Sequence, residues 1–115
     1  MSRLDSFIRR LEAQRACIGE AVRLTSGIDG FVLELGLGNG RTYDHLREVC
    51  IGREIYVFDR RVAAHPDCIP AQDHLFLGEI TETLPQALQR LGPGAALVHT
   101  DVGTGDQEGN QRLAA

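Results

Sequence analysis

The stretch FVLELGLGNGRT, residues 31–42, decides the fold of this chain. It begins with a short apolar run, Phe31–Leu35, of the kind that forms a fully buried strand of a parallel sheet. Three glycines then alternate at positions 36, 38 and 40, and a helical pattern follows from Arg41 to Cys50. Glycine at such a junction allows a tight turn and lets a ligand approach the main chain closely. The stretch therefore predicts a strand–loop–helix unit whose loop binds a ligand.

Helices and strands alternate on both sides of this unit. A long amphipathic helix is predicted from Ser2 to about Leu24, with Ser2 and Asp5 as a capping pair and Gly27 as its stop. Cys17 and Cys50 fall on apolar helical positions and are expected in the core. Further elements are predicted from the apolar patterns: strands at Glu54–Phe58, His74–Leu77 and Ala95–Thr100, and a helix at Thr81–Leu91.

Prolines restrict both the helix at Thr81–Leu91 and the connection 60–73. Pro85 is tolerable in the last helix only near its first turn. The connection 60–73 holds Pro66 and Pro70 and has room for one or two helical turns at most. Short buried strands that alternate with helices predict parallel βαβ units with right-handed crossovers.

Composition excludes several classes of function. The chain has 115 residues, enough for one domain, and a formal net charge of −4, which disfavours a general nucleic-acid binder. All 12 basic residues are arginine, so this sequence lacks the lysine of a phosphate-binding NTPase loop. No segment approaches the roughly 20 apolar residues of a membrane span. The charged N-terminus does not resemble a secretory signal, and three scattered cysteines indicate free thiols in a reducing cytoplasm.

The glycine loop does not fit a dinucleotide. That fingerprint needs G-x-G-x-x-G/A, and counting from Gly36 places Arg41 at the third position, where a small residue is required. The spacing is instead G-x-G-x-G, with Glu34 two residues before the first glycine. A strand acid aimed at a ligand suits a cation better than a pyrophosphate, and Glu34 could pair with the amino group of a methionine moiety.

The run Glu34-Leu-Gly-Leu-Gly-Asn-Gly40 resembles the first motif of class I S-adenosylmethionine-dependent methyltransferases. The resemblance implies a Rossmann-like three-layer α/β sandwich with a parallel sheet of order 3-2-1-4 in this chain. It also implies that the cofactor S-adenosyl-L-methionine lies against Glu34, Gly36, Leu37, Gly38, Asn39 and Gly40. Asp59 would then hold the ribose hydroxyls, Glu79 and Ile80 would lie near the adenine, and Asp101 would face the transferred methyl group.

Two residues at the end of the last strand are candidates for a general base. Asp101 and His99 lie two apart and so point to the same face of the sheet. A histidine in an apolar run is more often a hydrogen-bonded core residue, and that alternative stays open for His99. Asp101 with Asp106 is too small a set of acids to define a Mg²⁺ site, and no metal is predicted.

The chain is predicted to be a single S-adenosylmethionine-binding domain over 1–115, with an N-terminal helix in 1–26 and βαβ units in 31–105. Four strands are predicted where the family has seven, which favours either a piece of a longer chain or a minimal domain completed by a partner. The helix 1–26 suits either a homo-oligomer contact or a lid over the cofactor pocket.

The expected activity is methyl transfer to a small-molecule or protein acceptor, with neither bulk nucleic acid nor a membrane as partner. A non-catalytic cofactor-binding or interaction domain is the alternative from a different class. An NAD-dependent enzyme is a weaker one, against which Arg41 argues.

Overall fold

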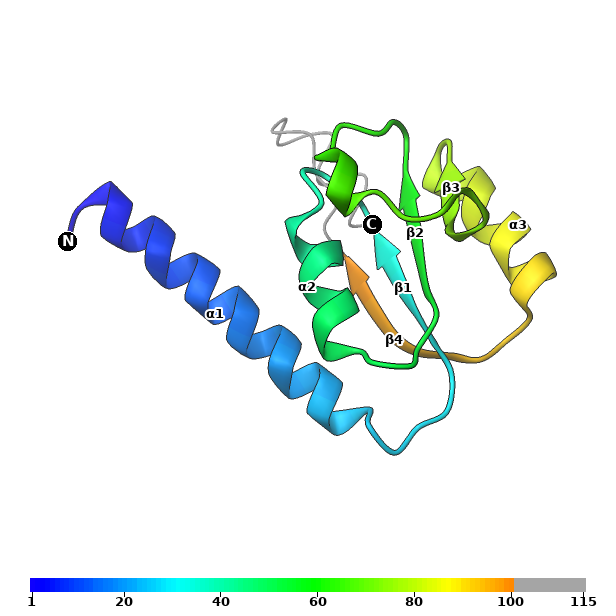
Figure 1. The fold of residues 1–115 in the computed structure, drawn as a ribbon, viewed down its shortest axis with the longest axis horizontal. Helices are drawn as coiled ribbons and strands as arrows, with labels where there is room; N and C mark the ends of the chain where they lie inside the picture. Colours follow the sequence, from blue (N-terminus) through cyan, green and yellow to red (C-terminus); the bar gives the residue numbers. More distant parts are fainter. Residues whose placement is uncertain (101–115) are drawn as a thin grey trace.

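The computed structural model describes residues 1–100 as a parallel β-sheet flanked by helices (Figure 1). The sheet contains β1 (Phe31–Leu35), β2 (Ile55–Asp59), β3 (Leu75–Leu77) and β4 (Ala95–Thr100). All pairings are parallel and the order is β3-β2-β1-β4. The predicted Rossmann-like α/β architecture and the order 3-2-1-4 are therefore confirmed.

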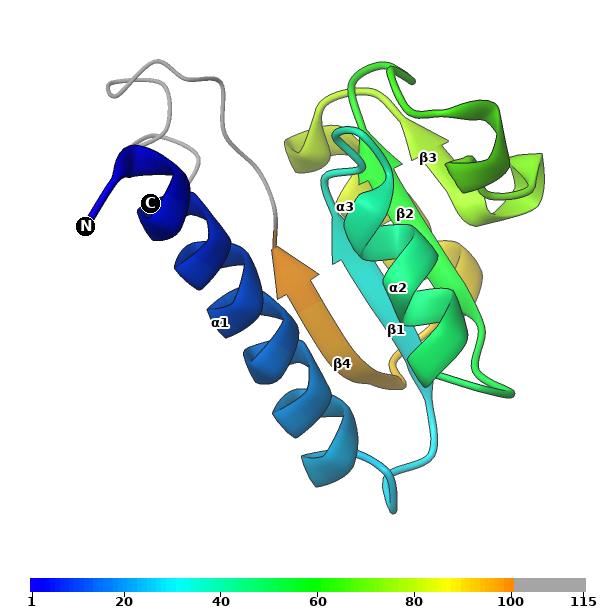
Figure 2. The same cartoon turned by 60° about the vertical axis from the view of Figure 1, so that its left-hand side comes forward.

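The helices lie on both faces of the sheet. Helices α1 (Arg3–Leu24) and α2 (Arg41–Val49) lie on one face, and α3 (Ile80–Leu91) covers the other (Figures 1 and 2). Because side chains alternate along a strand, β1 contributes to both cores. On one face Val32 packs with Leu46 of α2, and on the other Leu33 packs with Ala87 of α3.

Within residues 1–100, helix α1 packs against the sheet through its second half. Ser2 and Asp5 form the predicted capping box. The helix ends at Leu24: Thr25 still donates its main-chain N–H to the Ala21 carbonyl, but Ser26 and Ile28 donate three residues back, to Arg23 and Thr25, as in turns. Gly27 is therefore not the stop. Ile18 is buried against the sheet, whereas the apolar side chains of the first half are exposed: Leu4, Phe7, Ile8 and Leu11.

Proline placement explains two features on the β3 side. Helix α3 begins at Ile80, one residue before the predicted start, so Pro85 is its sixth residue and lies early in the second turn. Pro85 has no N–H to donate, yet the buried face of Thr83 and Ala87 carries the helix on to Leu91. Between β2 and β3 the chain makes only two short 3₁₀ turns, Pro66–Cys68 and Gln72–His74, as predicted.

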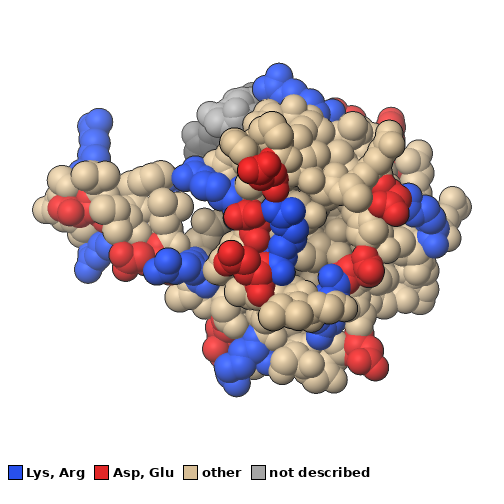
Figure 3. Space-filling view, viewed as in Figure 1, with Lys and Arg blue, Asp and Glu red and all other residues tan. Residues whose placement is uncertain are grey.

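The molecular surface carries both signs of charge. Figure 3 shows arginine and acidic side chains interleaved on one face of the molecule, including along α1. This face has no continuous basic patch of the kind that attracts nucleic-acid phosphates. In the part of the chain that the structure describes, no helix is both long and apolar enough to cross a membrane.

Candidate functional site

The carboxyl ends of the four parallel strands meet at one edge of the sheet. The chain passes from β1 outward to β2 and β3, then returns to β4 on the other side of β1. The strand order therefore switches between β1 and β4, which is where open α/β sheets bind ligands. Glu34 near the end of β1, Asp59 at the end of β2 and His99 near the end of β4 all lie at this edge.

The loop after β1 turns on glycines in the left-handed region. Gly36, Gly38 and Gly40 have φ angles of 106°, 56° and 87°. A Cβ on Gly40 would lie 2.5 Å from the Cβ of Cys68 and 2.9 Å from its carbonyl oxygen, so this glycine permits close packing. A Cβ on Gly38 would have no heavy atom within 4 Å. Gly38 therefore leaves open space beside the main chain, where a ligand can approach.

Asp59 ties this loop to the end of β2. Its Oδ2 accepts hydrogen bonds from the N–H groups of Leu37, at 2.8 Å, and Gly38, at 3.1 Å, and its Oδ1 accepts one from Arg60, at 2.7 Å. Burial by itself would raise the pKa of Asp59, but these N–H donors outweigh it and lower the pKa below its ordinary value. Asp59 is thus a charged carboxylate that shapes the glycine loop.

Glu34 and His99 form a pair across the switch point. They are register partners in β1 and β4, and His99 Nδ1 lies 2.8 Å and 3.0 Å from the two carboxylate oxygens of Glu34. Glu34 is only 1% exposed to solvent, whereas the His99 side chain is 23% exposed. Because an ionised carboxylate only accepts, Nδ1–H is the donor. The pair places a buried carboxyl group behind a partly exposed imidazole.

The other predicted site residues surround this centre. The Leu37 side chain is buried in the core, so only its main chain faces the loop. Asn39 Oδ1 accepts from the Arg41 N–H at 3.0 Å and so supports the start of α2. Glu79 is exposed just before α3, with Oε1 3.7 Å from Arg60 Nη1, and Ile80 packs in the α3 core. Asp101 and Asp106 lie outside the described residues.

The comparisons with known proteins decide the family. The family described as S-adenosyl-L-methionine methyltransferase matches residues 1–115. This chain belongs to that family. A crystal structure of an S-adenosyl-L-methionine methyl transferase from Silicibacter pomeroyi DSS-3 is 56% identical in sequence, with a TM-score of 0.87; the match covers 99% of this chain and 70% of that one. Among curated proteins no match was found.

The cofactor of this methyltransferase family is S-adenosyl-L-methionine, and the residues present suit it. The open main chain at Gly38 offers a surface that a side chain would otherwise fill. Asp59 places a charged acceptor beside that surface, as hydroxyl groups of a sugar require. The fit therefore rests on the loop geometry and on the chemistry of the strand ends.

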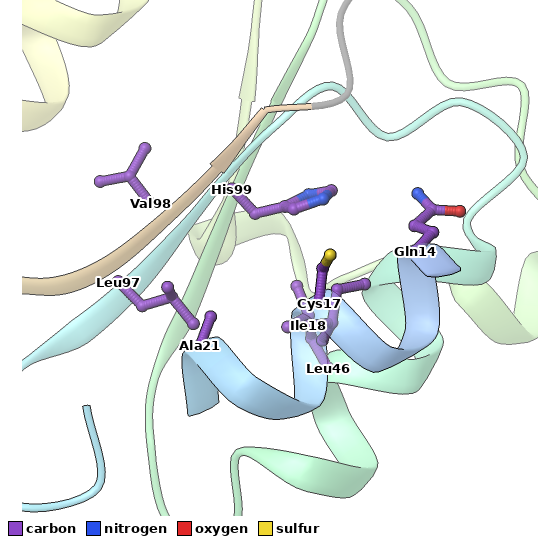
Figure 4. A pocket seen from close by; sticks show the side chains of 8 residues that line it. All are labelled: Gln14, Cys17, Ile18, Ala21, Leu46, Leu97, Val98 and His99. Carbon is purple, nitrogen blue, oxygen red and sulfur yellow. The ribbon is translucent and has the colours of Figure 1, made fainter. Parts of the chain in front are cut away.

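A pocket between α1 and β4 was not predicted from the sequence. Its volume is about 240 Å³, and Figure 4 shows residues from both elements around it: Gln14, Cys17, Ile18 and Ala21 of α1, and Leu97 and His99 of β4. Cys17 was expected in the core but is exposed and lines this pocket, whereas Cys50 is buried as predicted. The sequence carried one signal for this pocket: the small residues of the run Ala16-Cys17…Gly19…Ala21. Small side chains on a helix leave room between the helix and the element packed beside it.

Proposed function

We propose that this chain is an S-adenosyl-L-methionine-dependent methyltransferase that acts on a small-molecule or protein acceptor at the carboxyl edge of its sheet. The observation that carries the proposal is the loop of three positive-φ glycines held by Asp59 beside the switch in strand order. Family membership supports the same reaction class.

The cofactor would lie across the tips of β1, β2 and β3. The main chain of residues 36–40 would contact it most closely, Asp59 would accept from its ribose hydroxyls, and Glu79 with Ile80 would flank its adenine. S-adenosyl-L-methionine supplies a methyl group already activated by a sulfonium, so the protein mainly has to align the acceptor with that methyl. The exposed position of Glu79 next to the start of α3 supports its place in this arrangement.

Proton removal from the acceptor would fall to the end of β4. We assign His99, near the end of β4, as a candidate base, and Asp101, outside the described residues, as a second candidate from the sequence. The partly exposed ring of His99 supports its role.

Calorimetric titration of the purified chain with S-adenosylhomocysteine and with NADH tests the proposal. We expect S-adenosylhomocysteine to bind and NADH not to bind. Release of S-adenosylhomocysteine from S-adenosyl-L-methionine, measured with a panel of hydroxyl, amine and thiol acceptors, then tests turnover. Binding of NADH alone would overturn the assignment, and binding without turnover on any acceptor would support a non-catalytic cofactor-binding domain.

A further inference from the structure

The pocket between α1 and β4 adjoins the Glu34–His99 pair. We propose that this pocket is the acceptor site, that it takes a neutral, single-ring molecule with one ionisable hydroxyl, and that Glu34 positions His99 to remove the hydroxyl proton. The inference rests on the proposed methyltransferase function and adds to it a substrate class and a positioning residue.

The size and lining of the pocket determine the class of acceptor. A volume of about 240 Å³ lies below the roughly 300–1,000 Å³ of sites for drug-sized ligands, so it suits a molecule of one ring. Ile18, Ala21 and Leu97 make apolar walls, while Gln14 and His99 supply polar groups. No arginine, aspartate or glutamate is among its lining residues in the described part of the chain. Against these described lining residues, a carboxylate or phosphate on the acceptor would lose its hydration without meeting an arginine.

The Glu34 contact fixes how His99 presents its ring. With Nδ1–H donated to the buried carboxylate, the neutral imidazole carries its lone pair on Nε2. The same ring lines the pocket (Figure 4). A carboxylate behind a histidine holds the tautomer and stabilises the imidazolium that forms when the ring accepts a proton. This arrangement gives Glu34 a positioning role in place of direct contact with the methionine amino group.

These groups account for every bond and proton in the methyl-transfer step. The acceptor oxygen forms a bond to the methyl carbon as the carbon–sulfur bond breaks. The bonding pair stays on sulfur, which loses its positive charge, and the hydroxyl proton passes to His99. The products are a methyl ether, S-adenosylhomocysteine and an imidazolium paired with Glu34, which then releases the proton to solvent.

Filling the pocket tests its role as the acceptor site. Ala21→Trp places an indole among the lining residues, and Ala16→Trp puts the same side chain at an exposed position of α1 as the matched control. The probe is phenol, with binding followed by ligand-observed NMR in the presence of S-adenosylhomocysteine. We expect phenol binding to weaken at least about tenfold in Ala21→Trp and to stay unchanged in Ala16→Trp, with S-adenosylhomocysteine affinity unchanged in both.

Two results separate this inference from the proposed function. Phenol that binds equally well to wild type and Ala21→Trp, or does not bind wild type at all, overturns the acceptor site while cofactor binding stands. Failure of S-adenosylhomocysteine to bind wild type overturns the proposed function itself.

The positioning role of Glu34 is tested by a measurement that reports which nitrogen of the His99 ring carries the proton. In ¹⁵N-histidine-labelled protein, we expect His99 to show the single Nδ1–H tautomer in wild type and a mixture in Glu34→Gln, because an amide can both donate and accept. Methyl transfer to phenol should fall about 10²-fold in kcat with KM for phenol nearly unchanged. Glu34→Asp keeps the charge on a shorter side chain and should give an intermediate loss, which keeps the test valid if Glu34→Gln does not fold. An unchanged His99 tautomer and kcat in the folded variants would overturn the role.

Discussion

At the scale of single residues, the glycines at 38 and 40 serve different purposes although the sequence presents them as one repeat. Both have positive φ, which a side chain tolerates poorly. Only Gly40 is also crowded, because its Cβ would overlap Cys68 in the segment after β2. Gly38 faces open space. The motif therefore combines a packing requirement at Gly40 with open space at Gly38, a difference that the sequence alone does not show.

This difference predicts opposite outcomes for two alanine substitutions. Gly40→Ala should lower the free energy of unfolding by about 2–4 kcal/mol, from backbone strain and from overlap with Cys68. Gly38→Ala should cost only about 1–2 kcal/mol of backbone strain, yet weaken S-adenosylhomocysteine binding more than Gly40→Ala does. Urea unfolding and calorimetric titration measure the two effects. Equal losses of affinity in both variants would mean that Gly38 does not lie against the ligand.

Asp59 predicts a pH-dependent contribution to stability. Asp59→Asn should lower the free energy of unfolding at neutral pH by about 1–3 kcal/mol, because the N–H groups of Leu37 and Gly38 lose a charged acceptor. The folded state lowers the pKa of Asp59. Its stabilising effect is therefore full above the ordinary value of 3.8 and is lost as pH falls through the lowered folded value.

Urea unfolding at several pH values checks this sign, with the exposed Asp29→Asn as control. The gap between wild type and Asp59→Asn should narrow in acid. If Asp59 binds the ribose as well, S-adenosylhomocysteine affinity should fall with stability. A folded Asp59→Asn chain with unchanged affinity would restrict Asp59 to holding the loop.

At the scale of elements, His74 joins the starts of β2 and β3. Its Nδ1 lies 2.8 Å from Asp73 Oδ1, its Nε2 contacts Glu54, and its ring stacks on Tyr56 with a centroid separation of 4.7 Å. The hydrogen bond to Asp73 raises the pKa of His74, burial opposes this, and Glu54 adds to the rise. His74 therefore stabilises the fold most fully below its ordinary pKa of 6.5, and the effect is lost as pH rises through the higher folded value.

Substitution of His74 by phenylalanine isolates this charge, because the ring stack on Tyr56 is kept. His74→Phe should cost about 0.5–1 kcal/mol of unfolding free energy near pH 5.5, a small value since both acidic partners are largely exposed. The cost should shrink toward pH 9. Denaturant unfolding across this range measures it. A cost that grows with pH would contradict the sign of the shift.

The local spacing of apolar residues was sufficient to predict the helices and strands, but not which side chains meet between neighbouring elements. The apolar runs ending at glycines and acids located the four strands of the described residues, with starts shifted by one residue where Glu54 and His74 precede β2 and β3. The Glu34–His99 contact could not be predicted, because it depends on the register that pairs β1 with β4 across 65 residues. Cys17 was misplaced for a similar reason: helical spacing indicates an apolar face but not how much of it a neighbour covers.

At the scale of the whole molecule, α1 packs against the sheet through the second half of its length. Ile18 is buried with Val32 and Leu46, and Figure 2 shows this end of α1 beside β4. Toward the N-terminus, Leu4 is 66% exposed. The stability that α1 gains from packing therefore depends on its second half, which also forms one wall of the pocket.

Two matched truncations test this uneven attachment. Ile18→Ala should lower the free energy of unfolding by about 2–4 kcal/mol, because it empties a buried site, whereas Leu4→Ala should change it by less than about 0.5 kcal/mol. Trypsin cleavage at Arg9, Arg10 and Arg15 should quicken in Ile18→Ala, since a detached helix opens locally more often. A cost for Leu4→Ala equal to that for Ile18→Ala would show that the first half of α1 is buried in solution, against a second copy or another part of the protein. If a second copy covers this half, the cost of Leu4→Ala should rise with protein concentration, whereas a cover within the same chain should give no such dependence.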